Sequence, residues 1–162
     1  MNTLVTVLTI IAALGCAVIG GIFFAFSTFI MNAFSQLPPP QGIAAMQNIN
    51  RVILRSLFIP VFLGTALLCG ILVILALLNS SNPAGSLLVI GSLLYIVGTF
   101  LVTILFNVPR NNKLETTVAN DATSLPIWED YLSRWTAWNH VRTVAALTAS
   151  AMFIAVLVYM PD

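Results

Sequence analysis

Residues 56–109, with the sequence SLFIPVFLGTALLCGILVILALL-NSSNPAG-SLLVIGSLLYIVGTFLVTILFNVP, contain no charged side chain. Two long apolar runs flank the short polar stretch at residues 79–85, whose Asn, Ser, Pro and Gly residues favour a turn. A helix of about 20 apolar residues is long enough to cross the hydrocarbon of a bilayer. The stretch therefore predicts two transmembrane helices joined as an antiparallel hairpin.

Two further runs, residues 2–50 and 143–161, also lack Asp, Glu, Lys and Arg. The chain is 59% hydrophobic and only 7% charged, whereas about 25% of the residues of a soluble domain are charged. We therefore expect one domain, residues 1–162, with an all-α fold: a four-helix transmembrane bundle that spans the membrane at about residues 4–34, 54–78, 87–106 and 143–160. The connections at about residues 35–53 and 107–142 are expected to carry helical extensions of the spans.

The basic residues all lie on one side of this arrangement. The six are found in the two longer connections or at their junctions with the spans: Arg51, Arg55, Arg110, Lys113, Arg134 and Arg142. The positive-inside rule places these connections in the cytoplasm, so we predict a multi-pass protein of the cell membrane with both termini on the non-cytoplasmic side. A net charge of +1 without a dense basic cluster excludes a nucleic-acid surface.

The helical extensions have their own signals. Residues 41–59 place apolar side chains at helical spacing, and Pro60 would then kink or restart the helix. Ser124 is the expected cap of a fourth helix that begins well before the membrane. In the first span, small residues recur at every fourth position, which suits close packing inside the monomer or, as the alternative, against a second copy in a homo-oligomer: Ala13, Ala17, Gly21 and Ala25.

A polar ridge marks the end of the third span. Thr103, Asn107 and Asn111 are four residues apart and share one helical face, with Arg110 beside them. Pro109 removes a backbone donor from the same turn. At membrane depth, such an interruption is tolerated where protein or a water-filled cavity satisfies the freed backbone group. A helix that simply ends in a polar turn at the membrane interface explains the spacing as well.

An aromatic patch precedes the fourth span. At 100° per residue, one arc of about 100° of the helical wheel holds several aromatic residues, an amide and a cation. That face could bind a flat aromatic ligand whose anionic oxygen meets the cation, or its rings could anchor the helix at the membrane interface. The residues are Trp128, Tyr131, Trp135, Trp138, Asn139 and Arg142.

His140 is the only histidine, and its side chain is the one suited to proton transfer near neutral pH. On a helical wheel it lies about 160° from Arg142, so one straight helix cannot aim both at a single small atom. His140 is either a base that faces a pocket or a structural residue. Nucleotide-binding loops, paired intramembrane carboxylates and metal-ligand spacings are absent from the sequence.

The chain resembles the anthrone oxygenase-like family of small four-helix membrane proteins. The resemblance rests on residues 21–27 (GIFFAFS), 46–50 (MQNIN), 107–114 (NVPRNNKL) and 135–142 (WTAWNHVR). One departure is Asn32, where the family pattern has a proline. The resemblance implies an oxygenase that acts with O2 on a hydrophobic aromatic substrate, anthrone-like or quinol-like.

The same resemblance assigns roles to residues of both polar patches. His140 would be the base, and Asn107, Asn111, Asn139 and Arg142 would donate hydrogen bonds to the developing oxyanion. Tyr131, Trp135 and Trp138 would form the slot for the rings. A deprotonated anthrone can pass an electron directly to O2, so no cofactor is expected, with haem as the alternative. A non-catalytic protein that binds a lipid, a quinone or haem, or that serves as a scaffold, is the competing interpretation.

Overall fold

The computed structural model describes residues 3–78, 85–121 and 123–159, and the regular secondary structure of this part of the chain is helical, with no strand. Four helices are long and apolar enough to cross a membrane: Thr3–Ser35, Phe58–Leu78, Gly85–Glu115 and Ser124–Tyr159. The prediction of an all-α bundle with four spans is confirmed, and the chain is a multi-pass membrane protein. Since hydrocarbon is about 30 Å thick and a helix rises 1.5 Å per residue, the spans of 33, 31 and 36 residues extend beyond it.

Three of the four spans contain π-helical turns, labelled η. The first span consists of α1 (Thr3–Ala25), η1 (Phe26–Ile30) and α2 (Met31–Ser35), and the second is α4 (Phe58–Leu78). The third consists of α5 (Gly85–Leu93), η2 (Leu94–Leu101), η3 (Thr103–Asn107) and α6 (Val108–Glu115). The fourth consists of α7 (Ser124–Asp130), η4 (Tyr131–Trp135) and α8 (Thr136–Tyr159). The remaining helix, α3 (Pro39–Ile53), lies between the first two spans.

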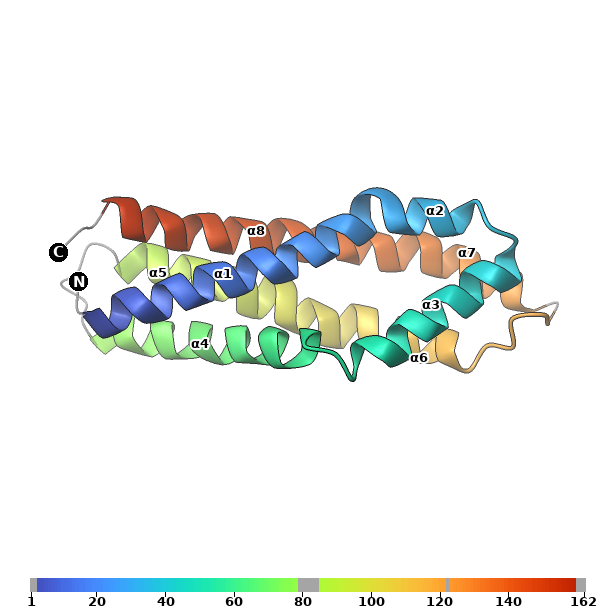
Figure 1. The fold of residues 1–162 in the computed structure, drawn as a ribbon, viewed down its shortest axis with the longest axis horizontal. Coiled ribbons are helices and arrows are strands. Elements are labelled where there is room, and N and C mark those ends of the chain that lie inside the picture. Colours follow the sequence, from blue (N-terminus) through green and yellow to red (C-terminus); the bar gives the residue numbers. More distant parts are fainter. Residues whose placement is uncertain (1–2, 79–84, 122, 160–162) are drawn as a thin grey trace.

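The four spans form a closed bundle (Figure 1). α1 packs against α4 and α8, and the third span packs against the same two helices from the other side. Glycines allow the closest approaches: a Cβ added at Gly98 would lie 2.5 Å from Cβ of Ala145, and one at Gly15 would lie 2.2 Å from Oγ1 of Thr65. α1 begins and α8 ends at the same end of the bundle.

α3 closes the opposite end of the bundle. Its apolar face joins a cluster of buried side chains from α2, α6, α7 and η4, which includes Ile43, Met46 and Trp128. The Gln47 amide donates to the carbonyls of Leu114 at 2.8 Å and Thr117 at 2.9 Å. These bonds tie the middle of α3 to the end of α6, so α3 covers the bundle as a fixed part of the fold.

Several predicted boundaries differ from the structure. α3 ends before the predicted break at Pro60, because Ser56 Oγ accepts the backbone N–H of Phe58 at 3.2 Å and starts α4 there. Pro60 therefore lies in the first turn of α4, where its missing N–H has no helical acceptor to lose. Ser124 does not cap the fourth span, since its Oγ donates to the Ala119 carbonyl and Thr123 occupies the cap position.

The ridge of small residues in the first span is divided between inside and outside. Ala13 is buried, but Ala17 and Gly21 are exposed, and no atom lies within 4 Å of a Cβ added at Gly21. The predicted packing within the monomer therefore holds for only part of the ridge, and contact with a second copy stays a prediction. The predicted turn at residues 79–84 and the end of the fourth span at Met160 lie outside the described residues.

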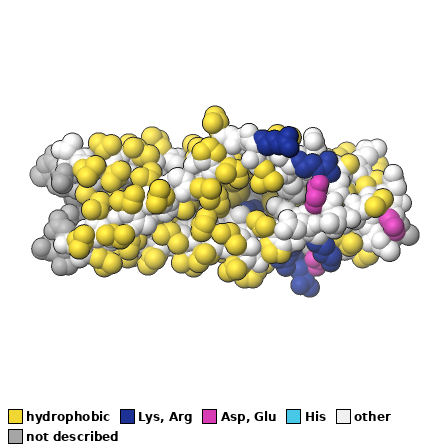
Figure 2. Space-filling view, turned by 90° about the horizontal axis from the view of Figure 1, so that it is seen from below, with side chains coloured by type: hydrophobic (Ala, Val, Ile, Leu, Met, Phe, Trp, Pro, Cys, Tyr) yellow, Lys and Arg dark blue, Asp and Glu magenta, His cyan; other side chains and the backbone are white. Residues whose placement is uncertain are grey.

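Charge is segregated along the bundle. On the face shown in Figure 2, hydrophobic side chains cover the part where the four spans run together, and charged side chains gather toward the end closed by α3 and α6. Two ion pairs lie in this charged part, Arg51 with Glu115 at 2.6 Å and Arg134 with Asp130 at 2.8 Å. This distribution fits one apolar zone inside the bilayer and one charged zone at its surface.

Candidate functional site

A cavity of about 240 Å³ lies where all four spans meet α3. Most of its wall is aromatic or aliphatic, and a small group of polar side chains gathers in it. The polar residues are Asn50, Thr103, Asn111 and Arg142, and the aromatic ones are Phe23, Phe26, Phe58, Phe62, Phe100 and Trp135. An apolar slot with a few polar groups is the usual form of a small-molecule site.

Arg142 is a buried cation in this cavity, with 4% of its surface exposed. Its NH1 donates to Oγ1 of Thr103 at 3.2 Å, and its guanidinium carbon lies 4.0 Å from the centre of the Phe23 ring and 5.1 Å from that of Trp135. Among the described residues no carboxylate forms an ion pair with it, and its Nε is buried without a hydrogen-bond partner. Because an unpaired buried charge is costly, this site favours an anion.

Asn139 holds Arg142 in place. The Arg142 NH2 donates to Oδ1 of Asn139 at 2.6 Å, while Nδ2 of Asn139 donates to the Phe23 carbonyl and to Oγ of Ser27, each at 2.7 Å. With acceptors for its nitrogen on one side and a donor for its oxygen on the other, the amide has a single orientation. Asn139 is fully buried and does not line the cavity, so its geometry suits positioning.

The Asn111 amide is also oriented by its neighbours. Its Oδ1 accepts hydrogen bonds from the Tyr131 hydroxyl at 2.8 Å and from Nε1 of Trp135 at 2.7 Å. The Tyr131 hydroxyl and the Trp135 N–H are both donors here, so the Asn111 atom that accepts from them is the amide oxygen. The Nδ2 of Asn111 is then left as a donor, and the Asn111 side chain lines the cavity. The polar ridge of the third span and the aromatic face of the fourth are therefore in contact.

Asn50 is a polar residue of the cavity that our sequence reasoning did not propose. It lies on α3, lines the cavity, and its Nδ2 is buried without a partner. Residues 46–50 carry part of the family resemblance, and that signal could have led to Asn50. Arg142, Asn111 and Asn50 together present N–H donors to one cavity, which suits a ligand with acceptor oxygens.

Asn107 and Trp138 lie beside the cavity and do not line it. Asn107 is fully buried, and its Nδ2 donates to the Trp135 carbonyl at 3.1 Å while its Oδ1 has no partner. The Trp138 ring stacks on Phe106 with 3.7 Å between the ring centres. Both side chains join η3 to the fourth span, so their observed contacts are structural, and the oxyanion and slot roles predicted for them stay predictions.

His140 is exposed and does not line the cavity. As the helical wheel indicated, it points away from Arg142, because α8 is a regular helix over both residues. The predicted role of His140 as the base is not tested by its position alone. Within the described ranges, none of the hydrogen bonds of Asn139 and Arg142 involves His140.

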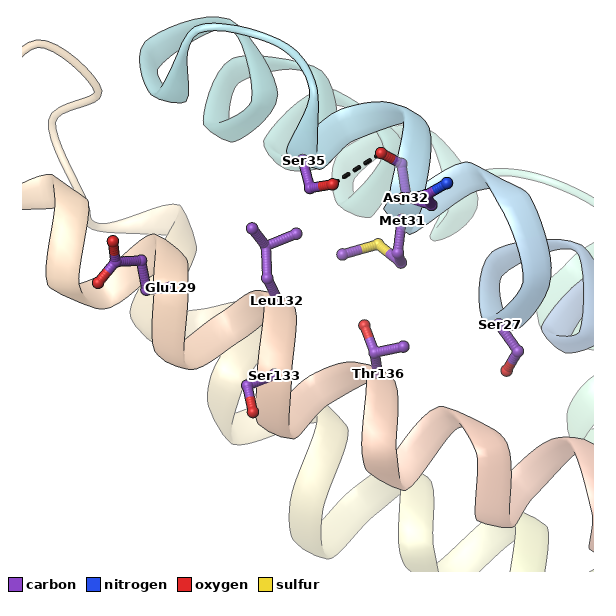
Figure 3. Close-up of a pocket in the computed structure, with 8 residues that line it drawn as sticks. All are labelled: Ser27, Met31, Asn32, Ser35, Glu129, Leu132, Ser133 and Thr136. Carbon is purple, nitrogen blue, oxygen red and sulfur yellow. Dashed lines mark hydrogen bonds between the residues drawn. The ribbon is translucent and has the colours of Figure 1, made fainter.

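A second hollow, an open groove of about 450 Å³, lies on another side of η4. Figure 3 shows α2 side chains such as Met31 and Ser35 facing Leu132 and Thr136 across it. Ser27 lines this groove and also accepts the hydrogen bond from Asn139. Asn139 thus links a residue of the groove, Ser27, to a residue of the cavity, Arg142.

Each π-helical segment from η1 to η4 contributes to the cavity wall: Phe26 lies in η1, Phe100 in η2, Thr103 and Ile104 in η3, and Trp135 in η4. Tyr131, also in η4, does not line the cavity but donates to Asn111, which does. A π turn inserts an extra residue and shifts the register of the side chains after it, and such turns are frequent at functional sites. Within the described residues, no group of three or more His, Cys, Asp or Glu side chains is placed to hold a metal ion.

A search of protein families matches residues 55–152 to the model described as anthrone oxygenase. The match covers more than half of the chain and includes Asn107, Asn111, Trp135, Asn139 and Arg142. No curated protein and no solved structure matches the chain.

Proposed function

Because the chain belongs to the anthrone oxygenase family, we propose that it is a membrane-embedded oxygenase that binds the anion of a flat, anthrone-like aromatic molecule beside Arg142. One observation carries the proposal: Arg142 lines an aromatic cavity as a buried cation, no carboxylate among the described residues pairs with it, and its Nε has no hydrogen-bond partner. The ligand would supply the missing negative charge.

The cavity suits the shape of such a ligand as well as its charge. Rings of Phe23, Phe62 and Trp135 line it, and flat aromatic molecules pack well against such walls. At 240 Å³ it lies below the range of about 300–1,000 Å³ that is common for ligand pockets. A compact ring system is therefore a better fit than a large macrocycle such as haem.

The proposed reaction needs no electron carrier besides the substrate. An anthrone has a CH2 carbon between two aryl rings, and loss of one proton gives an anion delocalised onto the carbonyl oxygen. The anion passes one electron to O2, and the resulting radical and superoxide combine into a peroxide at that carbon. The peroxide takes up a proton and loses water, so one anthrone and one O2 give one anthraquinone and one water.

The proposed role of Arg142 is to stabilise the anion. A nearby cation favours the charged form of an acid, which lowers the pKa of a bound substrate. Asn50 and Asn111 add N–H donors to the same oxygen or to a second oxygen of the ring system. Since the cavity lining contains neither a carboxylate nor an imidazole, the proton passes to water in this proposal, and the family-based assignment of His140 as base is kept as the competing mechanism.

Oxygen uptake tests the proposed function. The purified protein in nanodiscs, free of haem and metal, is given an anthrone, and O2 consumption and anthraquinone are measured against empty nanodiscs. Arg142→Met keeps a long side chain and removes the charge, so turnover should fall by about 10²-fold or more, as for loss of an oxyanion donor. The matched control is Arg134→Met, which removes an exposed arginine paired with Asp130. Equal rates with protein and with empty nanodiscs would refute the proposal.

A further inference from the structure

The cavity is open toward the outside of the bundle through an apolar mouth. Four residues of its wall are exposed aliphatic side chains, which means that they also form part of the outer surface. Their exposed fractions are 67% for Leu54, 50% for Leu63, 44% for Ile104 and 38% for Val108.

Part of this mouth is formed by helices that are apolar enough to cross a membrane. Leu63 belongs to the span Phe58–Leu78 and Ile104 to the span Gly85–Glu115. Beside Leu54 the helical wall is interrupted between the end of α3 at Ile53 and the start of α4 at Phe58. Since exposed apolar side chains of a membrane span meet acyl chains in a bilayer, such a mouth would give access from lipid.

The charged group of the same cavity is buried. Arg142 is 4% exposed, and the Asn139 side chain that holds it is 0% exposed. A ligand that places its oxygen on Arg142 must therefore turn its opposite, apolar edge toward Leu63 and Ile104. That edge faces lipid acyl chains directly.

We propose that the natural ligand carries an alkyl or prenyl tail on its aromatic head, and that this tail passes through the mouth beside Leu63 and Ile104 into the bilayer. The inference rests on the proposed function, since it uses the same cavity and the same polar groups. The cavity holds little more than a compact ring system, so a tail has to remain outside. Acyl chains are as apolar as the tail, so the tail stays in its preferred environment while the head is bound.

Two stable probes test the inference by binding. The first is 2-hydroxy-1,4-naphthoquinone, a flat anionic ring system, and the second is the same molecule with a decyl chain at carbon 3. Each is added to the protein in phosphatidylcholine nanodiscs, and the ligand retained beyond that of empty nanodiscs is quantified by mass spectrometry. Amounts are compared at equal mole fraction in the membrane, which removes the difference in partitioning. Both probes should bind.

A variant that fills the mouth should separate the two probes. Leu63→Trp should weaken binding of the decyl probe by about tenfold more than it weakens binding of the probe without a tail, which is the cost of overpacking. Leu67→Trp, one turn further along α4, is the matched control, because Leu67 is 67% exposed and does not line the cavity. Ile104→Trp with Leu105→Trp as its control repeats the test on the other edge of the mouth.

The outcomes separate this inference from the proposed function. If the decyl probe fails to bind while the tailless probe binds, or if the mouth variants weaken both probes equally, the tail does not leave through this mouth and the proposed function stands. If neither probe binds the wild-type protein, the anion site itself is wrong and both proposals fall.

Discussion

Asn139 joins Arg142 to the first span: its Oδ1 accepts from the arginine at 2.6 Å, and its Nδ2 donates to the Phe23 carbonyl at 2.7 Å. The position of the buried cation is therefore set by two spans that meet at one amide. An apolar replacement of Asn139 would leave both a guanidinium N–H and a backbone carbonyl without a partner in a buried site, which is costly.

Replacement of Asn139 should consequently reduce activity more than replacement of Ser27, which accepts a hydrogen bond from Nδ2 of Asn139. Asn139→Ala is expected to lower kcat/KM by about 10²-fold or more, comparable to loss of an oxyanion donor. Ser27→Ala removes only one of the two acceptors of Nδ2 and should cost a few-fold. Steady-state oxygen uptake with both variants gives the comparison. A larger loss for Ser27→Ala than for Asn139→Ala would contradict the positioning role of Asn139.

Replacement of the two amide side chains of the cavity, Asn50 on α3 and Asn111 on α6, should weaken ligand binding in both cases but lower protein stability only for Asn111. Asn50 Nδ2 has no partner, so Asn50→Leu should leave the thermal unfolding temperature nearly unchanged and weaken the tailless probe. Asn111→Leu removes the acceptor of both Tyr131 and Trp135, and each buried donor left unpaired costs about 1–3 kcal/mol. It should lower the unfolding temperature and weaken the probe. Equal unfolding temperatures for the two variants would count against this division.

The sequence predicted the fold because its signals are local and physical. Runs without charge predict membrane spans whatever the tertiary contacts are, and the six cations mark the polar end. Boundaries were less predictable. The start of α4 depends on the hydrogen bond from the Phe58 N–H to Ser56, and it lies two residues before Pro60, at which a kink or restart of the helix was predicted.

The site was predictable only in part. Spacing on a helical wheel put Tyr131, Trp135 and Arg142 on one face of the fourth span, and in the structure the Tyr131 and Trp135 rings stack and Arg142 lies over Trp135. Of the three, Trp135 and Arg142 line the cavity. The contribution of α3 could not be obtained in this way, because Asn50 reaches the cavity through the docking of α3 on α6. Helical spacing also does not show that the Trp138 ring, on the same predicted arc, stacks on Phe106.

Close packing of the third and fourth spans should depend on Gly98. A Cβ there would lie 2.5 Å from that of Ala145, whereas one at Gly21 meets nothing within 4 Å. Gly98→Ala should destabilise the protein by about 1–3 kcal/mol through overpacking, and Gly21→Ala should be neutral or stabilising, since alanine is the better helix former by about 1 kcal/mol. Denaturation in mild detergent measures both. Equal stability of the two variants would show that the bundle relaxes around Gly98.

The orientation in the membrane remains the prediction of the positive-inside rule. All six basic residues lie in the two longer connections or at their junctions with the spans, so those connections should be cytoplasmic and a fusion after Asp162 should be exported. An alkaline phosphatase joined there should be active and a green fluorescent protein dark. The reverse pair of results would invert the orientation and leave the four spans in place.

His140 and Arg142 offer the sharpest choice between mechanisms. If the exposed His140 is the base, His140→Ala should reduce turnover by about 10²- to 10⁴-fold while the probe without a tail still binds. We expect instead that His140→Ala retains turnover within a few-fold, because the side chain is exposed and does not line the cavity. Arg142→Lys should keep the charge but lose the geometry of the bonds to Thr103 and Asn139, so it should lie between wild type and Arg142→Met. A large loss in His140→Ala, with Arg142→Met nearly as active as wild type, would move the reaction out of the aromatic cavity and onto the exposed face of α8.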